Sequence, residues 1–105
     1  MSKSSITIEG EDLPNPSPGD ILRLDFLEPA GIDAADLARA LHVPPRRVSE
    51  VLRGRRPIDA DTDLRLARYF GLSAGFFLGL QADFDLMQRR RELGDDLEAI
   101  KPRAA

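Results

Sequence analysis

The sequence predicts an all-α fold, a domain of five helices with an extended arm before it and a polar tail after it. Between positions 18 and 91, apolar residues recur at spacings of three and four, the period of an amphipathic helix. Pro and Gly interrupt that pattern where helices usually begin and end. No segment shows a strong strand pattern, and the one candidate is the short stretch 6–8. We therefore assign residues 1–17 to the arm, 18–91 to the helical domain and 92–105 to the tail.

Prolines mark both ends of the first expected helix. Pro14 and Pro16 disfavour helix in the arm, whereas Pro18 suits a first helical turn. The helix is expected to stop before Pro29 and Gly31. Its apolar face is formed by Ile21, Leu22, Leu24, Phe26 and Leu27.

The next two helices are short and closely connected. Asp33 is expected to cap the second helix, and residues 42–44 separate that helix from the third. The third helix takes Pro45 into its first turn and is followed by Gly54 as a terminating residue. The inward residues of the two helices are Ala34, Leu37, Ala38, Leu41, Val48, Val51 and Leu52. Two short helices joined by so short a turn are typical of a helix-turn-helix.

Two further helices complete the domain. The fourth is expected over residues 60–70, with Gly71 to end it, and the fifth is expected to begin at a Ser73 cap. The apolar stripe of the fifth helix is Phe76, Phe77, Leu80, Phe84 and Met87. Residues 89–91 are arginines that suit a helix C-terminus, and the tail beyond Gly94 is expected to fray.

The charge of the chain is segregated. The formal net charge is −3, which argues against a protein that coats nucleic acid. Residues 39–56, however, hold six arginines against one glutamate, whereas residues 1–38 hold two bases against eight acids. The excess positive charge therefore falls on the third helix and the loop after it.

An exposed helix rich in arginine is typical of a DNA interface. Arginines release counterions when they bind phosphates, and their forked guanidinium reaches guanine O6 and N7. Glu50 is expected either to accept a hydrogen bond from cytosine N4 or to pair with Arg46. Arg55 and Arg56, just past the helix, are expected to hold phosphate. A solvated arginine face is the alternative interpretation.

Three segments of the chain resemble the HigA-type addiction-module antitoxins, within the XRE-like, lambda-repressor-like helix-turn-helix class. They lie between Pro18 and Met87. Their sequences are PGDILRLDFLEPAGI (18–32), LARALHVPPRRVSEVLRGRRPIDADTDLRLARYFGLS (37–73) and FFLGLQADFDL (76–86).

The resemblance implies a five-helix repressor that binds palindromic operator DNA as a homodimer and represses its own operon. It also implies that the chain neutralises a toxin protein, a small ribosome-dependent RNase. By position, it places Pro45, Arg46 and Glu50 against bases and Arg53 and Arg55 against the DNA backbone. The complete set of predicted DNA-binding residues is Pro45, Arg46, Arg47, Ser49, Glu50, Arg53, Arg55 and Arg56.

The chain departs from the family's pattern at two places. Many members have Ser-Gln at the start of the second helix, where the Gln reaches phosphate, but this chain has Asp33 and Ala34. The usual Trp and Asn of the fifth helix are replaced by Phe77 and Gly79. Glycine within a helix costs up to ~1 kcal/mol relative to alanine, so the fifth helix is expected to need packing or a partner.

Several features have a structural and a functional interpretation. His42 is expected to cap the second helix, with phosphate contact as the alternative. Core packing is expected for the aromatic stripe, and a toxin or dimer contact is the alternative. Solubility explains the acids of the arm and first helix as well as attraction to a basic toxin does. These acids are Glu9, Glu11, Asp12, Asp20, Asp25 and Glu28.

The sequence offers no motif for catalysis, metal or cofactor binding. It contains no cysteine and a single histidine, and the acids at 59, 61 and 63 begin a helix, where the dipole favours them. We expect no membrane span, no secretory signal at residues 1–10 and a cytoplasmic location. The remaining alternatives are a stand-alone repressor and a protein–protein interaction module that has lost DNA reading.

Overall fold

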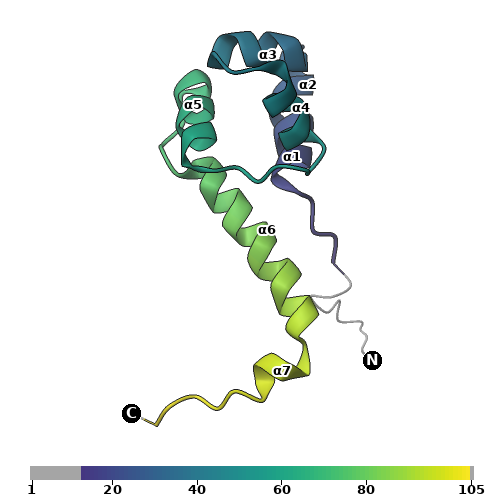
Figure 1. The fold of residues 1–105 in the computed structure, drawn as a ribbon, viewed down its shortest axis with the longest axis vertical. Coiled ribbons are helices and arrows are strands. Elements are labelled where there is room, and N and C mark those ends of the chain that lie inside the picture. The colour runs from purple at the N-terminus through teal and green to yellow at the C-terminus, as the bar shows by residue number, and fades with distance from the viewer. Residues whose placement is uncertain (1–12, 105) are drawn as a thin grey trace.

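The computed structural model describes residues 13–104, and these residues form helices without any strand (Figure 1). The predicted all-α fold is confirmed, whereas the candidate strand at 6–8 and the acids at 9, 11 and 12 lie outside the described residues. A body of short helices lies at one end of a long helix, which leads away from it toward the C-terminus. The elements are α1 (Pro18–Ile21), η2 (Leu22–Leu27), α2 (Glu28–Ala30), α3 (Ala34–Leu41), α4 (Pro45–Leu52), α5 (Ala60–Phe70), α6 (Phe76–Leu93) and α7 (Asp95–Glu98).

The first three elements form one continuous helical segment with a π-helical middle. It begins with a capping box, in which the backbone N of Asp20 donates to Ser17 Oγ at 3.1 Å and the backbone N of Ser17 donates to Asp20 Oδ2 at 3.2 Å. The prediction that this helix stops before Pro29 is wrong, because α2 includes that residue. In η2 the backbone bonds reach one residue further back, as the bond from Glu28 N to Arg23 O shows. Proline, which has no N–H to donate, is accommodated after this wider turn.

Helices α3 and α4 form the predicted helix-turn-helix. Asp33 caps α3 by accepting a hydrogen bond from the backbone N of Asp36 at 2.7 Å. The helix ends at Leu41, and the next residue, His42, has a left-handed backbone (φ 59°) and donates its N–H to the carbonyl of Arg39. This geometry supports the capping interpretation of the single histidine. Pro45 occupies the first turn of α4, as predicted.

The last long helix begins and ends later than the sequence predicts. The preceding helix α5 ends at Phe70 and is terminated by Gly71, in agreement with the prediction. Ser73 does not cap the next helix, however, since α6 begins three residues later, after Gly75. It also continues two residues past the expected boundary at 91. The tail after Gly94, which was expected to fray, contains α7.

The core lies where the helices of the body meet the first turns of α6. Phe77 is fully buried, and its ring centroid lies 5.3 Å from that of Phe26 and 6.3 Å from that of Phe70. The core-packing interpretation of the aromatic stripe holds for Phe77, whereas Phe76 is 41% exposed. The core cluster consists of Leu22, Leu27, Leu37, Ala38, Leu41, Val48, Val51, Ile58, Leu66 and Phe77.

Candidate nucleic-acid interface

Helix α4 has a buried apolar face and an exposed polar face. Val48 and Val51 are 4% and 3% exposed and pack into the core. The opposite side, which we call the α4 face, carries Pro45, Arg46, Ser49, Glu50 and Arg53. Helical spacing places Arg46 and Arg53 two turns apart near the middle of this face, and the Arg46 side chain is 87% exposed. The structure therefore brings five of the predicted DNA-binding residues together on one accessible surface.

Glu50 connects the α4 face to the loop that follows it. Its Oε2 accepts a hydrogen bond from Arg46 Nε at 3.0 Å, and its Oε1 accepts one from Arg56 Nε at 3.0 Å. Its backbone carbonyl accepts from the N of Arg55 at 2.8 Å and from the N of Arg56 at 3.3 Å. The guanidinium groups of Arg56 and Arg46 hold the pKa of Glu50 below its ordinary value. The loop with its arginines is thus held beside α4.

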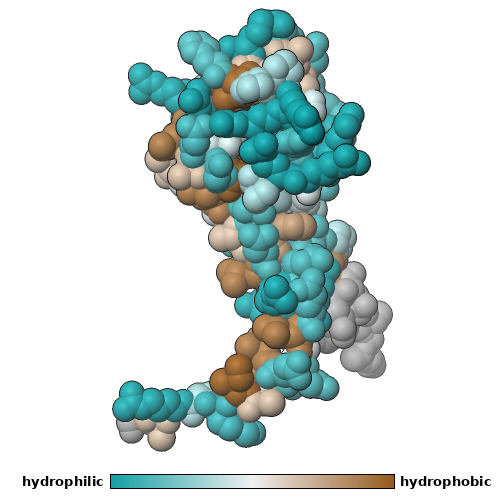
Figure 2. All heavy atoms as spheres, in the orientation of Figure 1, coloured by the Kyte–Doolittle hydropathy of each residue, from teal (hydrophilic) through white to brown (hydrophobic). Residues whose placement is uncertain are grey.

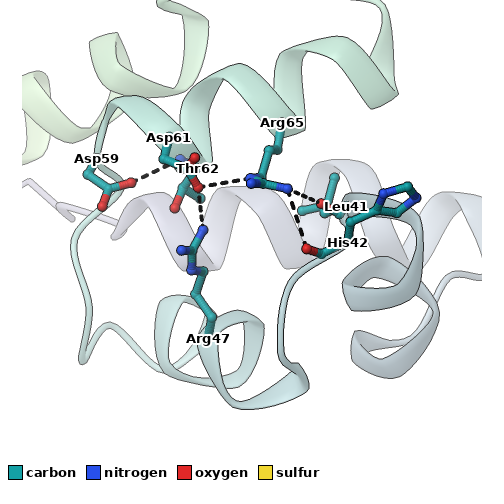
Figure 3. Close-up of polar contacts among 7 residues, drawn as sticks. All are labelled: Leu41, His42, Arg47, Asp59, Asp61, Thr62 and Arg65. Carbon is teal, nitrogen blue, oxygen red and sulfur yellow. Dashed lines mark hydrogen bonds and ion pairs between the residues drawn. The ribbon is translucent and has the colours of Figure 1, made fainter.

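Arg47 points away from the α4 face and toward α5 (Figure 3). Its Nη1 pairs with Asp61 Oδ2, and the same carboxylate oxygen accepts from Arg65 Nε at 2.9 Å. Arg65 also donates from Nη1 to the carbonyl of Leu41 at 2.8 Å. These contacts join α3, α4 and α5 and fix the orientation of α4. The structure therefore gives Arg47 a contact within the protein and separates it from the other predicted DNA-binding residues of its helix.

Arg53 and Arg55 differ from the neighbouring arginines in their surroundings. Both are exposed, and neither forms an ion pair within residues 13–104. Arg56, by contrast, shares the carboxylate of Glu50. A phosphate group would therefore meet Arg53 and Arg55 without first displacing a carboxylate of the described chain.

A close backbone contact sets the position of α4 relative to α1. Gly19 is buried against the end of α4, so that a Cβ at this position would lie 2.1 Å from Val51 O and 2.9 Å from Leu52 O. A second contact steadies the loop after α4, where Gln81 Oε1 of α6 accepts from the backbone N of Ile58 at 2.9 Å. Neither Gly19 nor Gln81 was predicted as a positioning residue from the sequence. The one signal for Gly19 is a glycine placed in a first helical turn, where helix propensity disfavours it.

Asp63 is a buried aspartate that caps α6 from a neighbouring helix. It is 1% exposed, and its Oδ1 accepts from the backbone N of Phe77 at 2.8 Å and of Leu78 at 2.9 Å. Its Oδ2 accepts from the N of Gly75 at 2.6 Å. The carboxylate thus satisfies N–H groups at the start of α6, the role that Ser73 was expected to have for this helix. A signal was present in the sequence, because Asp63 shares the inward stripe of α5 with Leu66, Ala67 and Phe70.

The other two acids at the start of α5 also have partners within the protein. Asp59 accepts from the backbone N of Thr62 at 2.9 Å and caps α5, and Asp61 holds two arginines. Within residues 13–104, no group of three acidic, histidine or cysteine side chains is placed to hold a metal ion. None of the helices described in that range combines the length and apolarity that crossing a membrane requires.

Acid is expected to destabilise the protein through three carboxylates of this region. Hydrogen bonds from Arg56 and Arg46 lower the pKa of Glu50, those from Thr62 lower the pKa of Asp59, and those from Arg47 and Arg65 lower the pKa of Asp61. A pKa that is lower in the folded than in the unfolded state adds stability above the unfolded value and loses it as the pH falls through the folded value. Urea unfolding at a series of pH values should therefore show a falling free energy of unfolding below about pH 4. The Asp61→Asn variant should show a shallower fall, and a wild-type stability that rises on acidification would contradict the prediction.

Comparison with known proteins places this fold in a family. A family model described as Helix-turn-helix matches residues 25–77, which include α3, α4 and α5. Virulence-associated protein I of Dichelobacter nodosus is 44% identical over 88 residues, which make up 84% of this chain and 82% of that protein. The chain belongs to the helix-turn-helix family.

Within the helix-turn-helix family, the chain is similar to antitoxins of the HigA type. Antitoxin HigA-1 of Vibrio cholerae is 33% identical over 86 residues, covering 82% of this chain and 81% of that protein. The solved structure of the Pseudomonas aeruginosa antitoxin HigA with the higBA promoter matches with a TM-score of 0.80 and 39% identity. That match covers 87% of this chain and 100% of the other. The resemblance to HigA-type antitoxins is therefore confirmed.

Proposed function

We propose that this helix-turn-helix protein is a sequence-specific DNA-binding antitoxin that represses its own operon. The α4 face carries the proposal, because it presents Arg46 with an 87% exposed side chain on the second helix of the helix-turn-helix. In proteins of this kind, that helix enters the major groove of DNA. The similarity to an antitoxin whose structure was solved with promoter DNA supports the proposal.

Within this proposal the predicted residues divide between bases and phosphates. Arg46 reaches guanine through its forked guanidinium, Pro45 and Ser49 lie beside it, and Glu50 accepts from cytosine N4. The phosphate-binding residues are Arg53, Arg55 and Arg56, whose contacts with the DNA backbone position the protein on the duplex. Arg47 contributes by holding α4 against α5 rather than by touching DNA.

The double variant Arg46→Ala/Arg53→Ala is expected to abolish binding to the DNA upstream of the protein's own operon. It removes a base contact and a phosphate contact from each subunit, so the affinity should fall at least ~100-fold. Wild-type binding should weaken steeply as salt is raised. Fluorescence anisotropy with a labelled upstream duplex measures both effects. The matched control is Arg68→Ala/Arg103→Ala, which removes the same charge away from α4 and should bind as the wild type does. Equal binding by both double variants would exclude the α4 face as the interface.

We further infer a homodimer in which a second copy covers the far part of α6. That part of α6 leaves the body of the domain, and apolar surface gathers there and at α7 (Figure 2). Leu86 is 59% exposed, Leu97 40% and Ile100 69%. A symmetric dimer buries apolar surface of this kind. Two copies of α4 would then meet two half-sites about one helical turn, or ~34 Å, apart.

The antitoxin part of the proposal concerns a protein partner, a small RNase toxin. The similarity to Antitoxin HigA-1 of Vibrio cholerae, which extends over most of that protein's length, supports it. Among the acids expected to attract a basic toxin, Asp20 and Glu28 already pair with Arg23 at 3.5 and 3.3 Å, whereas Asp25 forms no ion pair within residues 13–104.

The toxin assignment is tested in the gene neighbourhood of this chain. An adjacent reading frame should encode a small basic protein that arrests growth unless this chain is co-expressed. Without such a neighbour, the chain is a stand-alone repressor. If the wild type binds no upstream DNA even at low salt, the fold serves as a protein–protein interaction module instead.

A further inference from the structure

Glu50 is the single acidic residue in the arginine-rich segment 39–56, and both of its carboxylate oxygens are occupied. Oε2 accepts from Arg46 Nε at 3.0 Å, while Oε1 accepts from Arg56 Nε at 3.0 Å and lies 2.9 Å from Arg56 Nη2. The Glu50 side chain is only 25% exposed, so its charge is less screened by water than that of a fully exposed carboxylate. One glutamate thus holds two of the arginines that were predicted to bind DNA.

The remaining arginines of α4 and its loop fall into two groups. Arg47 is engaged by Asp61. Arg53 and Arg55 are exposed and have no carboxylate partner within residues 13–104. Before DNA arrives, the described surface therefore offers two unengaged guanidinium groups around α4 rather than five.

We propose that Glu50 sets the sequence selectivity of α4 by withholding Arg46 and Arg56 from DNA phosphates until a base donates a hydrogen bond to its carboxylate. This inference rests on the proposed DNA binding by α4. On an unmatched sequence, a phosphate must compete with Glu50 for either arginine, and the carboxylate itself is repelled by the DNA. Sequence-independent affinity is then limited to Arg53 and Arg55.

A matched sequence changes this balance. Cytosine N4 and adenine N6 are the base amino groups that point into the major groove, and each is a donor for a carboxylate. A hydrogen bond from such a group replaces the one that Arg46 supplies to Glu50 and leaves the guanidinium to bind guanine. A wrong base donates no hydrogen bond to Glu50, so Arg46 stays with the carboxylate and the carboxylate is repelled by the DNA. Selectivity arises from this penalty on binding to competing sites.

The Glu50→Gln variant tests the proposal, since glutamine keeps the size of the side chain and removes its charge. The probes are a duplex carrying the protein's own upstream sequence and a scrambled duplex of equal length, each titrated over a series of salt concentrations. Affinity for the scrambled duplex should rise about tenfold, and its log–log salt slope should steepen by up to about 2, because each newly contacted phosphate adds about 0.9. Affinity for the upstream duplex should rise less or fall, so the ratio of the two affinities should shrink.

Two further variants assign the effect to the arginines. Glu28→Gln removes the same charge from an ion pair with Arg23 in the first helical segment and should leave the affinity for both duplexes unchanged. Adding Arg56→Ala to Glu50→Gln should reverse part of the gain on the scrambled duplex. If a Glu50→Gln protein with wild-type melting temperature shows the wild-type slope and affinity on the scrambled duplex, the proposal for Glu50 is wrong while DNA binding stands. If the wild type binds neither duplex, the proposed function and this inference both fail.

Discussion

Replacement of Gly19 by alanine is expected to displace α4 and to impair both folding stability and DNA binding. The added Cβ would lie 2.1 Å from Val51 O and 2.9 Å from Leu52 O. Both atoms belong to the backbone at the end of α4, so no side-chain rotation relieves the contact. Helix α4 must therefore move away from the helical segment that begins at Pro18. Overpacking of this kind typically costs about 1–3 kcal/mol, and we expect the upper part of that range because the contact is with backbone.

Gly79 provides the matched control for this substitution. It also lies in a helix, but a Cβ at that position would have no neighbour within 4 Å. Gly79→Ala should therefore stabilise the protein by up to about 1 kcal/mol through helix propensity alone. Urea unfolding should show a lower free energy of unfolding for Gly19→Ala and a higher one for Gly79→Ala. Binding to the upstream duplex should weaken only for Gly19→Ala. A Gly19→Ala protein as stable and as tightly binding as the wild type would show that the α1–α4 contact does not position α4.

The Asp63→Ala variant is expected to loosen α6 from the rest of the domain. The carboxylate accepts hydrogen bonds from three backbone N–H groups at the start of α6 and is 1% exposed. Alanine would leave these donors without their acceptor, and each bond to a charged group contributes roughly 1.5–3 kcal/mol. Because alanine also removes the burial cost of the charge, we expect a net loss of about 3 kcal/mol.

Asp83→Ala is the control for this loss. Asp83 is an exposed aspartate of α6 that forms no ion pair within the described range 13–104. Its replacement should change the free energy of unfolding by no more than about 0.5 kcal/mol. Similar unfolding midpoints in urea for the two variants would mean that Asp63 does not hold the start of α6.

Most helix boundaries were predictable because their signals act within a single turn of the backbone. Asp33 bonds to an N–H three residues later, Pro45 needs only its own fixed φ, and Gly71 adopts a left-handed conformation with φ 70°. Ser73 and Pro29 gave the same kind of local signal, and both predictions were wrong. The carboxylate of Asp63 in α5, rather than Ser73, caps α6. The π-helical turn before Pro29 accommodates a residue that has no N–H to donate, so the helix continues through it.

The candidate interface could be predicted as a segment but not in its internal pairing. Arg46 and Arg47 are adjacent and chemically identical, and the spacing of Val48 and Val51 shows only which side of α4 is buried. It does not show that α5 places Asp61 beside Arg47, which lies 14 residues earlier in the chain. The contact of Gly19 with α4 depends in the same way on packing between distant segments. Sequence pattern therefore identified the charged helix, whereas tertiary packing decides which of its arginines face outward.

Methylation interference at guanine N7 tests most directly whether α4 reads DNA in the major groove. Methylation of N7 blocks the edge that Arg46 is proposed to contact. On the DNA upstream of the protein's own operon, we predict interference at guanines in two half-sites whose centres lie about one helical turn apart, and its loss at those guanines when the residual binding of Arg46→Ala is probed. Binding of the wild type that tolerates N7 methylation at every guanine would contradict the account.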